Sequence, residues 1–298
     1  MSVVDLPVST PVLPPTRRER TALASPRGRT SRWVSSVILG LIGLTFLVPL
    51  AWIVLASLNP SATVGVTWPG DPTFDNFSSV FTWEQTLLPL WNSTVISMGT
   101  AVITVVVSVL AAYPLSRYQM RFRKSFLYGI LFATCLPITA MMVPVYALFV
   151  QLKMLDSQVS VILFMAATSL PMAIWMLKNF MDSVPVSLEE AAWVDGASAM
   201  RALWTIVLPL MRPGISVVFI FVFTQAWGNF FVPFVLLFSS EKMPAAVAIF
   251  TFFGNHGAVA YGQLAAFATL YSVPILVLYL LVQRLSGSSF ALAGGVKG

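Results

Sequence analysis

The sequence predicts an all-α integral membrane protein with six transmembrane helices. Of its 298 residues, 57% are apolar and only 9% are charged, whereas a soluble globular protein usually carries about 25% charged residues. The mean hydropathy is +0.85, and the apolar residues gather in six stretches that lack Asp, Glu, Lys and Arg. This composition excludes an ordinary soluble enzyme and, for most of the chain, intrinsic disorder.

Each of the six stretches is long enough for one span, because a helix needs about 20 apolar residues to cross the hydrocarbon core. We expect the helices at residues 34–57, 92–115, 126–150, 159–177, 214–238 and 260–283. Each contains proline, namely Pro49, Pro114, Pro137 with Pro144, Pro171, Pro233 and Pro274. Proline frees a backbone carbonyl, which lipid tolerates only where neighbouring helices or a cavity satisfy it. These prolines are either routine kinks or markers of a pathway or hinge.

The placement of Lys and Arg predicts the orientation in the membrane. Of the 17 basic residues, Lys153 and Lys242 fall in outer segments when the N-terminus is inside, and the remaining 15 fall in cytoplasmic segments. Both termini are therefore expected in the cytoplasm. Residues 1–33 are expected to form a disordered basic tail that contacts anionic lipid, with no signal-peptide pattern. Residues 286–298 are expected to form a second cytoplasmic tail.

The expected spans lack the residues that chemistry in a membrane would need. Every Asp, Glu, Lys and Arg falls outside them, which argues against proton coupling and an intramembrane aspartyl protease. One cysteine, Cys135, and one histidine, His256, exclude a disulfide framework and a zinc site. The chain has no phosphate-binding G-x-x-x-x-G-K-[ST] loop. We expect no catalytic residue, cofactor or metal here, so any energy must come from another chain.

The segment 178–213 between the fourth and fifth spans is long and carries helix signals. Ser187 and Glu190 have capping-box spacing, and Gly196 is placed to end that helix in a left-handed conformation. A second helix is expected from about Ser198 to Val207, ending before Pro209. The segment is therefore either a helical hairpin that projects from the membrane or an amphipathic hairpin that lies on the headgroups.

The residues of this hairpin resemble the EAA loop of bacterial ABC importer permeases, whose pattern is E-A-A-x₃-G-x₉-I-x-L-P. All seven positions are filled, by Glu190, Ala191, Ala192, Gly196, Ile206, Leu208 and Pro209. From about residue 34 the chain resembles the maltose-permease G family of carbohydrate-type importers. Further matches are Asn92-Ser93, Ala111-Ala112-Tyr113-Pro114-Leu115-Ser116-Arg117 and the C-terminal Ala293-Gly294-Gly295-Val296-Lys297-Gly298. The chain departs from the family at Trp227-Gly228-Asn229-Phe230, where the family commonly has Trp-Asn-Glu-Phe.

The resemblance implies a type I ABC importer permease with its six helices in residues 34–285 and a coupling helix hairpin in residues 178–213. It implies a bacterial inner-membrane protein with four kinds of partner: the lipid bilayer, a second permease subunit, two ATPase subunits that bind ATP and Mg, and an extracytoplasmic solute-binding protein. Nucleic acid is not expected. Contact with the ATPase is expected from Glu189, Glu190, Ala191, Ala192, Asp195, Gly196 and Ala197. Lys297 in the tail is expected to reach between the two ATPase subunits.

Polar residues in the expected spans are candidates for a solute pathway, because sugars are bound by aromatic stacking and by amide and hydroxyl groups. The candidates are Asn92, Gln225, Trp227, Asn229 and Gln263. The same residues also suit hydrogen bonds between helices. The expected solute is a sugar or sugar-like compound, and a glycerophosphodiester or polyol stays open.

Three further alternatives stay open from the sequence. A passive channel or facilitator would share the composition but would not need the hairpin, and a membrane enzyme would need a catalytic set that the chain lacks. The apolar outer loop 239–259, with His256, either packs on the bundle or reaches into the binding protein.

Overall fold

The computed structural model describes residues 27–65, 67–253 and 259–286. Within these ranges regular structure is helical, apart from an isolated bridge between Phe253 and Val259. Four of the described helices are long and apolar enough to cross a membrane. Two further pairs of helices are each bent at a short break, namely Arg123–Ala133 with Ile138–Gln151 and Ala199–Leu210 with Arg212–Trp227. The predicted all-α membrane fold is therefore confirmed, with four spans, or six if each bent pair is one span.

The first span is the helix α2 (Arg27–Ser57). The helix begins at Arg27, inside the tail expected at residues 1–33, whereas its apolar span is Trp33–Ser57, in agreement with the span expected at 34–57. Hydropathy marks only where a helix becomes apolar, whereas capping and breaking residues decide where it starts. The chain divides within α2 into two compact units, Met1–Trp52 and Ile53–Gly298.

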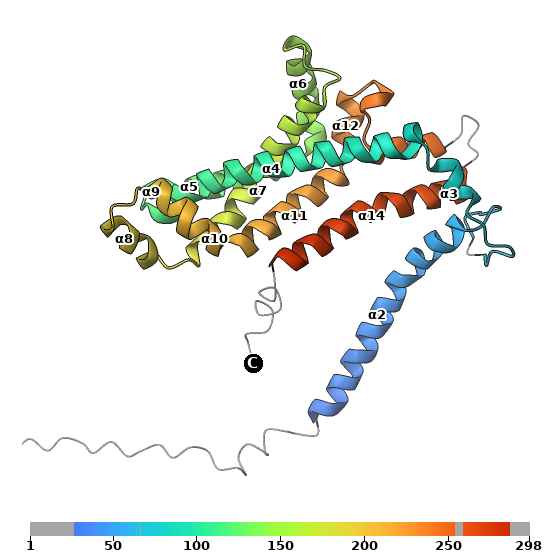
Figure 1. Cartoon of the computed structure of the whole chain (residues 1–298), viewed down its shortest axis with the longest axis horizontal. Helices are drawn as coiled ribbons and strands as arrows, with labels where there is room; N and C mark the ends of the chain where they lie inside the picture. The colour runs from blue at the N-terminus through green and yellow to red at the C-terminus, as the bar shows by residue number, and fades with distance from the viewer. Residues whose placement is uncertain (1–26, 66, 254–258, 287–298) are drawn as a thin grey trace, which may run out of the picture. The chain divides into compact units, whose positions relative to one another are not determined.

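The centre of the second unit is the helix α4 (Leu88–Arg117), which continues from the short helix α3 (Asp75–Val80) and the π-helix η1 (Trp83–Leu87). Figure 1 shows α4 running beside α7 (Gln158–Asp182) and α11 (Arg212–Trp227). Their shared core includes Val105, Val109, Leu177, Val218, Val222 and Trp227. These three helices therefore form the frame that positions the rest of the unit.

Small residues bring the helices of this frame close together. A Cβ atom placed on Gly214 of α11 would lie 2.5 Å from the Phe180 ring of α7. One face of α4 is a buried stripe of hydroxyl residues, namely Ser93, Ser97, Thr100, Thr104 and Ser108. Helices in lipid lack a hydrophobic driving force between them, so close packing of small residues supplies much of their attraction.

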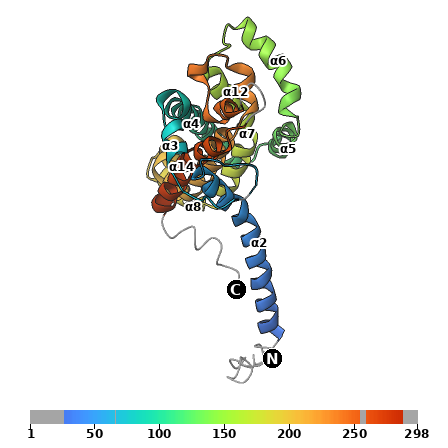
Figure 2. The ribbon, with the colours of Figure 1, turned by 90° about the vertical axis from the view of Figure 1, so that its right-hand side faces the viewer.

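The expected third span at 126–150 is two helices, α5 (Arg123–Ala133) and α6 (Ile138–Gln151), which meet at 90°. Pro137 lies at the break in an extended conformation. Proline disfavours the helical conformation in the residue before it and cannot donate a backbone hydrogen bond. The expectation of one continuous helix is therefore wrong, and Figure 2 shows α6 leading down to α5, which is seen nearly end-on.

The expected fifth span at 214–238 is also interrupted. The helix α11 ends at Trp227, and α12 (Phe231–Leu236) begins after a short break. The Asn229 side-chain oxygen accepts a hydrogen bond from the Val232 amide at 3.0 Å, which satisfies a free donor at the start of α12. Gly228 and Asn229 thus form a turn in place of the expected continuous helix.

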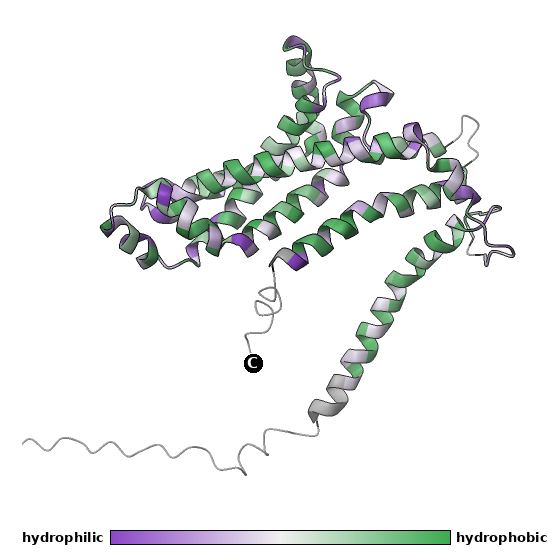
Figure 3. Cartoon of the chain, viewed as in Figure 1, coloured by the Kyte–Doolittle hydropathy of each residue, from purple (hydrophilic) through white to green (hydrophobic). Residues whose placement is uncertain are grey.

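The segment after α12 folds back onto the last helix, α14 (Tyr261–Ser286). It contains η3 (Ser240–Lys242), α13 (Ala245–Ala248) and η4 (Ile249–Phe252). Its buried side chains pack with α3 and α14 in a second core of Val80, Ala245, Ala248, Phe252, Ala266 and Phe267. The described part of the loop 239–259 is therefore packed on the bundle, while His256 lies outside the described residues. Figure 3 shows hydrophobic residues dominating the long helices.

Candidate functional site

The segment expected to form a hairpin does so, beside the C-terminal end of α4 (Figure 1). Its first arm is α8 (Ser187–Val194), and its second arm is α9 (Ala199–Ala202), η2 (Leu203–Val207) and α10 (Leu208–Leu210). We call these residues, 187–210, the hairpin. The second arm passes through Pro209, so the end expected before it is wrong. A π-turn at 203–207 places Pro209 at the start of the next helical segment, where its missing N–H is tolerated.

The turn between the two arms is built as the sequence predicts. Gly196 has φ +84°, a left-handed conformation that glycine adopts without strain. The Gly196 amide donates to the Trp193 carbonyl at 3.0 Å, and the Ala197 amide donates to the Ala192 carbonyl at 2.9 Å. These two bonds form the Schellman motif that ends a helix. Ser198 then caps the second arm by accepting from the Arg201 amide at 3.3 Å.

The expected capping box of Ser187 and Glu190 is wrong. The residue before the helix is Val186, already helical at φ −63° and ψ −30°, and no side chain caps it. The Glu189 and Glu190 amides donate to the Val186 carbonyl at 2.9 and 3.0 Å. Because the Val186 carbonyl accepts from both amides, neither the Ser187 hydroxyl nor the Glu190 carboxylate caps the helix.

Glu189 is the one buried residue of α8. Its Oε1 accepts from Arg117 Nε at 2.5 Å, and its Oε2 accepts from the Tyr113 hydroxyl at 2.9 Å. Both partners lie on the last turns of α4. Neither the burial of Glu189 nor its partners were predicted, although Arg117 ends the sequence run 111–117 that resembles the importer family. We call Tyr113, Arg117 and Glu189 the anchor residues.

The other hairpin residues expected to meet an ATPase subunit lie at the surface. Glu190, Ala191, Asp195 and Gly196 are exposed, and Ala192 and Ala197 are half-buried. Large apolar side chains are exposed around them, including Leu188, Trp193, Val194, Met200 and Trp204, with Val194 at 87%. A surface of this kind is typical of a protein interface.

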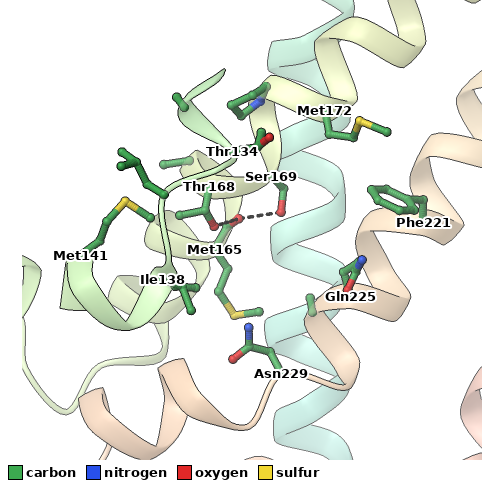
Figure 4. Close-up of a pocket in the computed structure, with 15 residues that line it drawn as sticks. Thr134, Ile138, Met141, Met165, Thr168, Ser169, Met172, Phe221, Gln225 and Asn229 are labelled. Atoms are coloured by element: carbon green, nitrogen blue, oxygen red, sulfur yellow. Dashed lines mark hydrogen bonds between the residues drawn. The ribbon is translucent and has the colours of Figure 1, made fainter. Parts of the chain in front are cut away.

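A second candidate site is a cavity of about 480 Å³ that forms where the α5–α6 break faces α7 and α11. Figure 4 shows Gln225 and Asn229 on one side, Thr168, Ser169 and Met165 of α7 beside them, and Ile138 and Met141 of α6 on the far side. The Thr168 and Ser169 hydroxyls donate to the Met165 carbonyl at 3.0 and 2.8 Å. Irregular backbone at membrane depth is tolerated where it lines a cavity, and the break at Thr134–Pro137 fits that rule.

Three of the expected pathway residues lie elsewhere. Trp227 is 1% exposed in the core, where it stacks on Phe223 and receives a hydrogen bond at its carbonyl from the Tyr271 hydroxyl at 2.8 Å. Asn92 donates to the Glu241 and Met243 carbonyls at 2.8 and 3.1 Å. Gln263 is half-buried near the start of α14. The structure therefore brings only Gln225 and Asn229 together.

One expected contact residue falls outside the described ranges. Lys297 lies beyond residue 286, outside the described residues. Among the residues that are described, no group of three or more His, Cys, Asp or Glu side chains could hold a metal ion.

The family described as the inner membrane component of binding-protein-dependent transport systems matches residues 104–290. The sulfoquinovosyl glycerol transport system permease protein of Agrobacterium fabrum is 31% identical over 279 residues, 91% of this chain and 95% of that protein. The diacetylchitobiose uptake system permease protein of Streptomyces coelicolor is 30% identical over 280 residues, 91% of this chain and 98% of that protein.

A solved structure has the same fold. It is a chain of a bacterial ABC transporter involved in the import of the acidic polysaccharide alginate, with a TM-score of 0.75 at 23% identity. The match covers 87% of this chain and 98% of that chain. The family match, the relatives that span nearly the whole chain and the shared fold lead to one conclusion. The chain belongs to the family of inner-membrane permease components of binding-protein-dependent transport systems.

Proposed function

We propose that this chain is one permease subunit of an ATP-driven importer for a sugar or sugar-like solute, in a bacterial inner membrane with both termini in the cytoplasm. The observation that carries the proposal is the hairpin. It presents the E-A-A residues and several large apolar side chains at its surface, while a buried ion pair attaches it to α4. A passive channel would have no use for such an element.

The hairpin is the proposed docking element for an ATPase subunit. Ala191 is small and exposed, so a partner surface can approach α8 closely, and Glu190 offers an unburied carboxylate for a basic partner residue. The apolar side chains Leu188, Val194 and Met200 supply area that a partner would bury. One chain carries one hairpin, so a pair of ATPase subunits needs a second permease subunit.

The proposed solute pathway is the cavity between α5, α6, α7 and α11. Gln225 and Asn229 supply amide groups, and Phe221 and Met172 supply apolar surface, a combination that suits the polar edges and apolar faces of a sugar ring. Relatives are described as permeases for diacetylchitobiose and galactooligosaccharides, which supports a carbohydrate-type solute. A binding protein on the outer side would deliver it.

Crosslinking tests the docking. A single cysteine at Ala191 or Ala197, in a Cys135→Ser background and labelled with a benzophenone maleimide, should photocrosslink to the ATPase subunit that co-purifies with the chain. The matched control is Ser240→Cys, exposed in η3 at the other end of α4, which should give no such crosslink. Uptake of a panel of mono- and oligosaccharides by cells lacking the native chain, with and without the cloned one, tests the solute class.

The alternative of a passive channel or facilitator predicts a different result. No ATPase subunit would co-purify, neither hairpin cysteine would crosslink, and uptake would continue after ATP is depleted. That set of outcomes would refute the importer.

A further inference from the structure

The anchor residues form a polar network in which every charged atom has a partner. Arg117 Nε contacts Glu189, its Nη1 donates to the Ser116 hydroxyl at 3.1 Å, and its Nη2 donates to the Val184 carbonyl at 3.2 Å. Both Glu189 oxygens are bonded, and the Tyr113 hydroxyl also lies 3.3 Å from the Ala199 carbonyl. The Arg117 and Glu189 side chains are 3% and 0% exposed. The charged groups of the network are therefore both buried and paired.

This network joins α4 to three neighbouring segments that lie 67 to 86 residues later in the chain. Tyr113 and Arg117 come from α4, Glu189 from α8, the Ala199 carbonyl from α9, and the Val184 carbonyl from the turn that follows α7. Beside it, Asp182 at the end of α7 accepts from the Ser116 hydroxyl at 2.6 Å and pairs with Lys178. The hairpin thus meets α4 and α7 at one point.

The hairpin is attached to the bundle in two different ways. Its second arm inserts Leu203 and Val207 into the core formed by α4, α7 and α11. Its first arm, α8, buries only Glu189. Apolar contacts hold surfaces together without direction, whereas hydrogen bonds and ion pairs need particular angles. The apolar contact attaches the hairpin, and the anchor residues determine the orientation of α8 relative to α4.

Stability alone is a poor explanation for this arrangement. Replacing a buried ion pair by apolar residues of similar volume is often neutral or stabilising, because taking two charges out of water costs about as much as their attraction returns. Buried ionic groups are retained in some proteins because they specify one arrangement over others.

We propose that Tyr113, Arg117 and Glu189 are positioning residues that make α8 and α4 move as one body. Movement of the ATPase subunit against α8 then turns α4, and α4 packs along α7, which lines the solute cavity. This inference rests on the proposed docking of the hairpin and adds the residues through which the movement reaches the spans.

Three variants separate positioning from folding. Arg117→Met with Glu189→Leu removes both charges and keeps apolar volume. Tyr113→Phe removes one hydroxyl from the network. Glu189→Gln keeps the size of the side chain and leaves Arg117 without its counter-charge. Glu84→Gln, the same chemical change on an exposed residue in η1, is the matched control.

The readout uses the complex of the full-length chain, the second permease subunit and the ATPase subunits in lipid nanodiscs, and it needs no knowledge of the solute. Thr134, on the wall of the cavity, is replaced by cysteine in a Cys135→Ser background. We measure its rate of modification by N-ethylmaleimide without nucleotide and with ATP and vanadate, and in parallel the captured ATPase subunit and the rate of ATP hydrolysis.

In the chain with unaltered anchor residues, the labelling rate of the cysteine at position 134 should change when nucleotide is added. The Glu84→Gln control should show the same change. In the doubly apolar variant and in Glu189→Gln, ATPase capture and hydrolysis should stay within about twofold, while the nucleotide-dependent change in labelling falls about tenfold, within the usual range of coupling free energies. Tyr113→Phe should reduce it by a smaller factor.

Two results would overturn the positioning role. One is a normal labelling change in the doubly apolar variant. The other is a loss of labelling change that only follows a loss of captured ATPase subunit. If the apolar variant does not assemble, an unchanged response in Tyr113→Phe is decisive against the role. Failure of the unaltered chain to capture any ATPase subunit would instead refute the proposed function.

Discussion

Two neighbouring carboxylates in the hairpin have opposite environments. Glu189 is fully buried against Arg117, and Glu190 is exposed beside Ala191. Successive helical residues point about 100° apart, so one position decides whether a side chain faces the bundle or a partner. Glu189 therefore belongs to the attachment of the hairpin and Glu190 to its proposed docking surface.

The turn at Gly196 leads to a prediction about a single methyl group. An added Cβ at Gly196 would meet nothing within 4 Å, and the same is true of Gly129 in α5. Of these two glycines, only Gly196 has a positive φ. Gly196→Ala should therefore cost about 1–2 kcal/mol through its left-handed conformation, whereas Gly129→Ala should be neutral or stabilise its helix.

Hydrogen exchange of the α8 amides in the purified chain checks this prediction. Exchange should be faster in Gly196→Ala and unchanged in Gly129→Ala. Uptake should fall in Gly196→Ala, because α8 is the proposed docking helix. Equal exchange in the two variants would show that the glycine conformation contributes nothing to the turn.

At the scale of elements, the hydrogen bonds and ion pair of Asp156, which we call the clasp, connect two segments at the end of the bundle opposite the anchor residues. Asp156, in the turn between α6 and α7, accepts from the Phe238 and Ser239 amides at 2.9 and 3.0 Å. Its other oxygen accepts from the Ser239 hydroxyl at 2.6 Å and from Lys242 at 2.8 Å. One carboxylate thus ties the α6–α7 turn to the segment between α12 and α13. This end is the proposed outer face.

Asp156→Ala should release that segment. Lys242 is 44% exposed, so trypsin added to spheroplasts should cut after Lys242 faster in Asp156→Ala than in the unaltered chain. Glu241→Ala, on an exposed neighbour outside the clasp, is the control and should not change the rate. Equal cleavage in both variants would mean that the α13 packing alone holds the segment.

The clasp also has a defined pH dependence. The hydrogen bond from Lys242, followed by those from Ser239 and Phe238, holds the pKa of Asp156 well below its ordinary 3.8. A lowered pKa stabilises the folded state above the ordinary value, and this contribution is lost as the pH falls through the folded pKa. Cleavage relative to the control should therefore be flat between about pH 6 and 8.

At the scale of the whole molecule, the proposed solute cavity depends on two broken helices and one continuous one. The break between α5 and α6 opens one wall, the turn at Gly228 and Asn229 limits another, and α7 passes between them. Asn229 also caps α12 through the Val232 amide, so its replacement would change both folding and pathway. Gln225 is the cleaner probe of the cavity.

Gln225→Leu should lower uptake about three- to tenfold, the usual effect of losing one hydrogen bond to a solute, at an unchanged membrane level. Uptake of the saccharide identified in the panel, normalised to the amount of chain in the membrane, is the measurement. Gln263→Leu makes the same change away from the cavity and should transport normally. Equal loss in the two variants would place the pathway elsewhere.

The sequence by itself determined the features that depend on local chemistry. Runs of apolar residues predict which segments enter lipid, and the all-α membrane fold followed from them. Gly196 predicts its own turn, because only glycine adopts a left-handed conformation freely. The E-A-A spacing was sufficient to indicate the importer family, which the match to residues 104–290 confirms.

Only the tertiary structure decided which polar residues are structural and which line the cavity. Glu189 meets Arg117 across 72 positions of the chain, and Asn92 meets Glu241 across 149. Trp227 and Gln225 are two residues apart, yet one lies in the core and the other lines the cavity. Hydropathy and spacing describe a helix in isolation, whereas burial depends on which helices pack against each face. That choice is made by contacts between segments far apart in the chain.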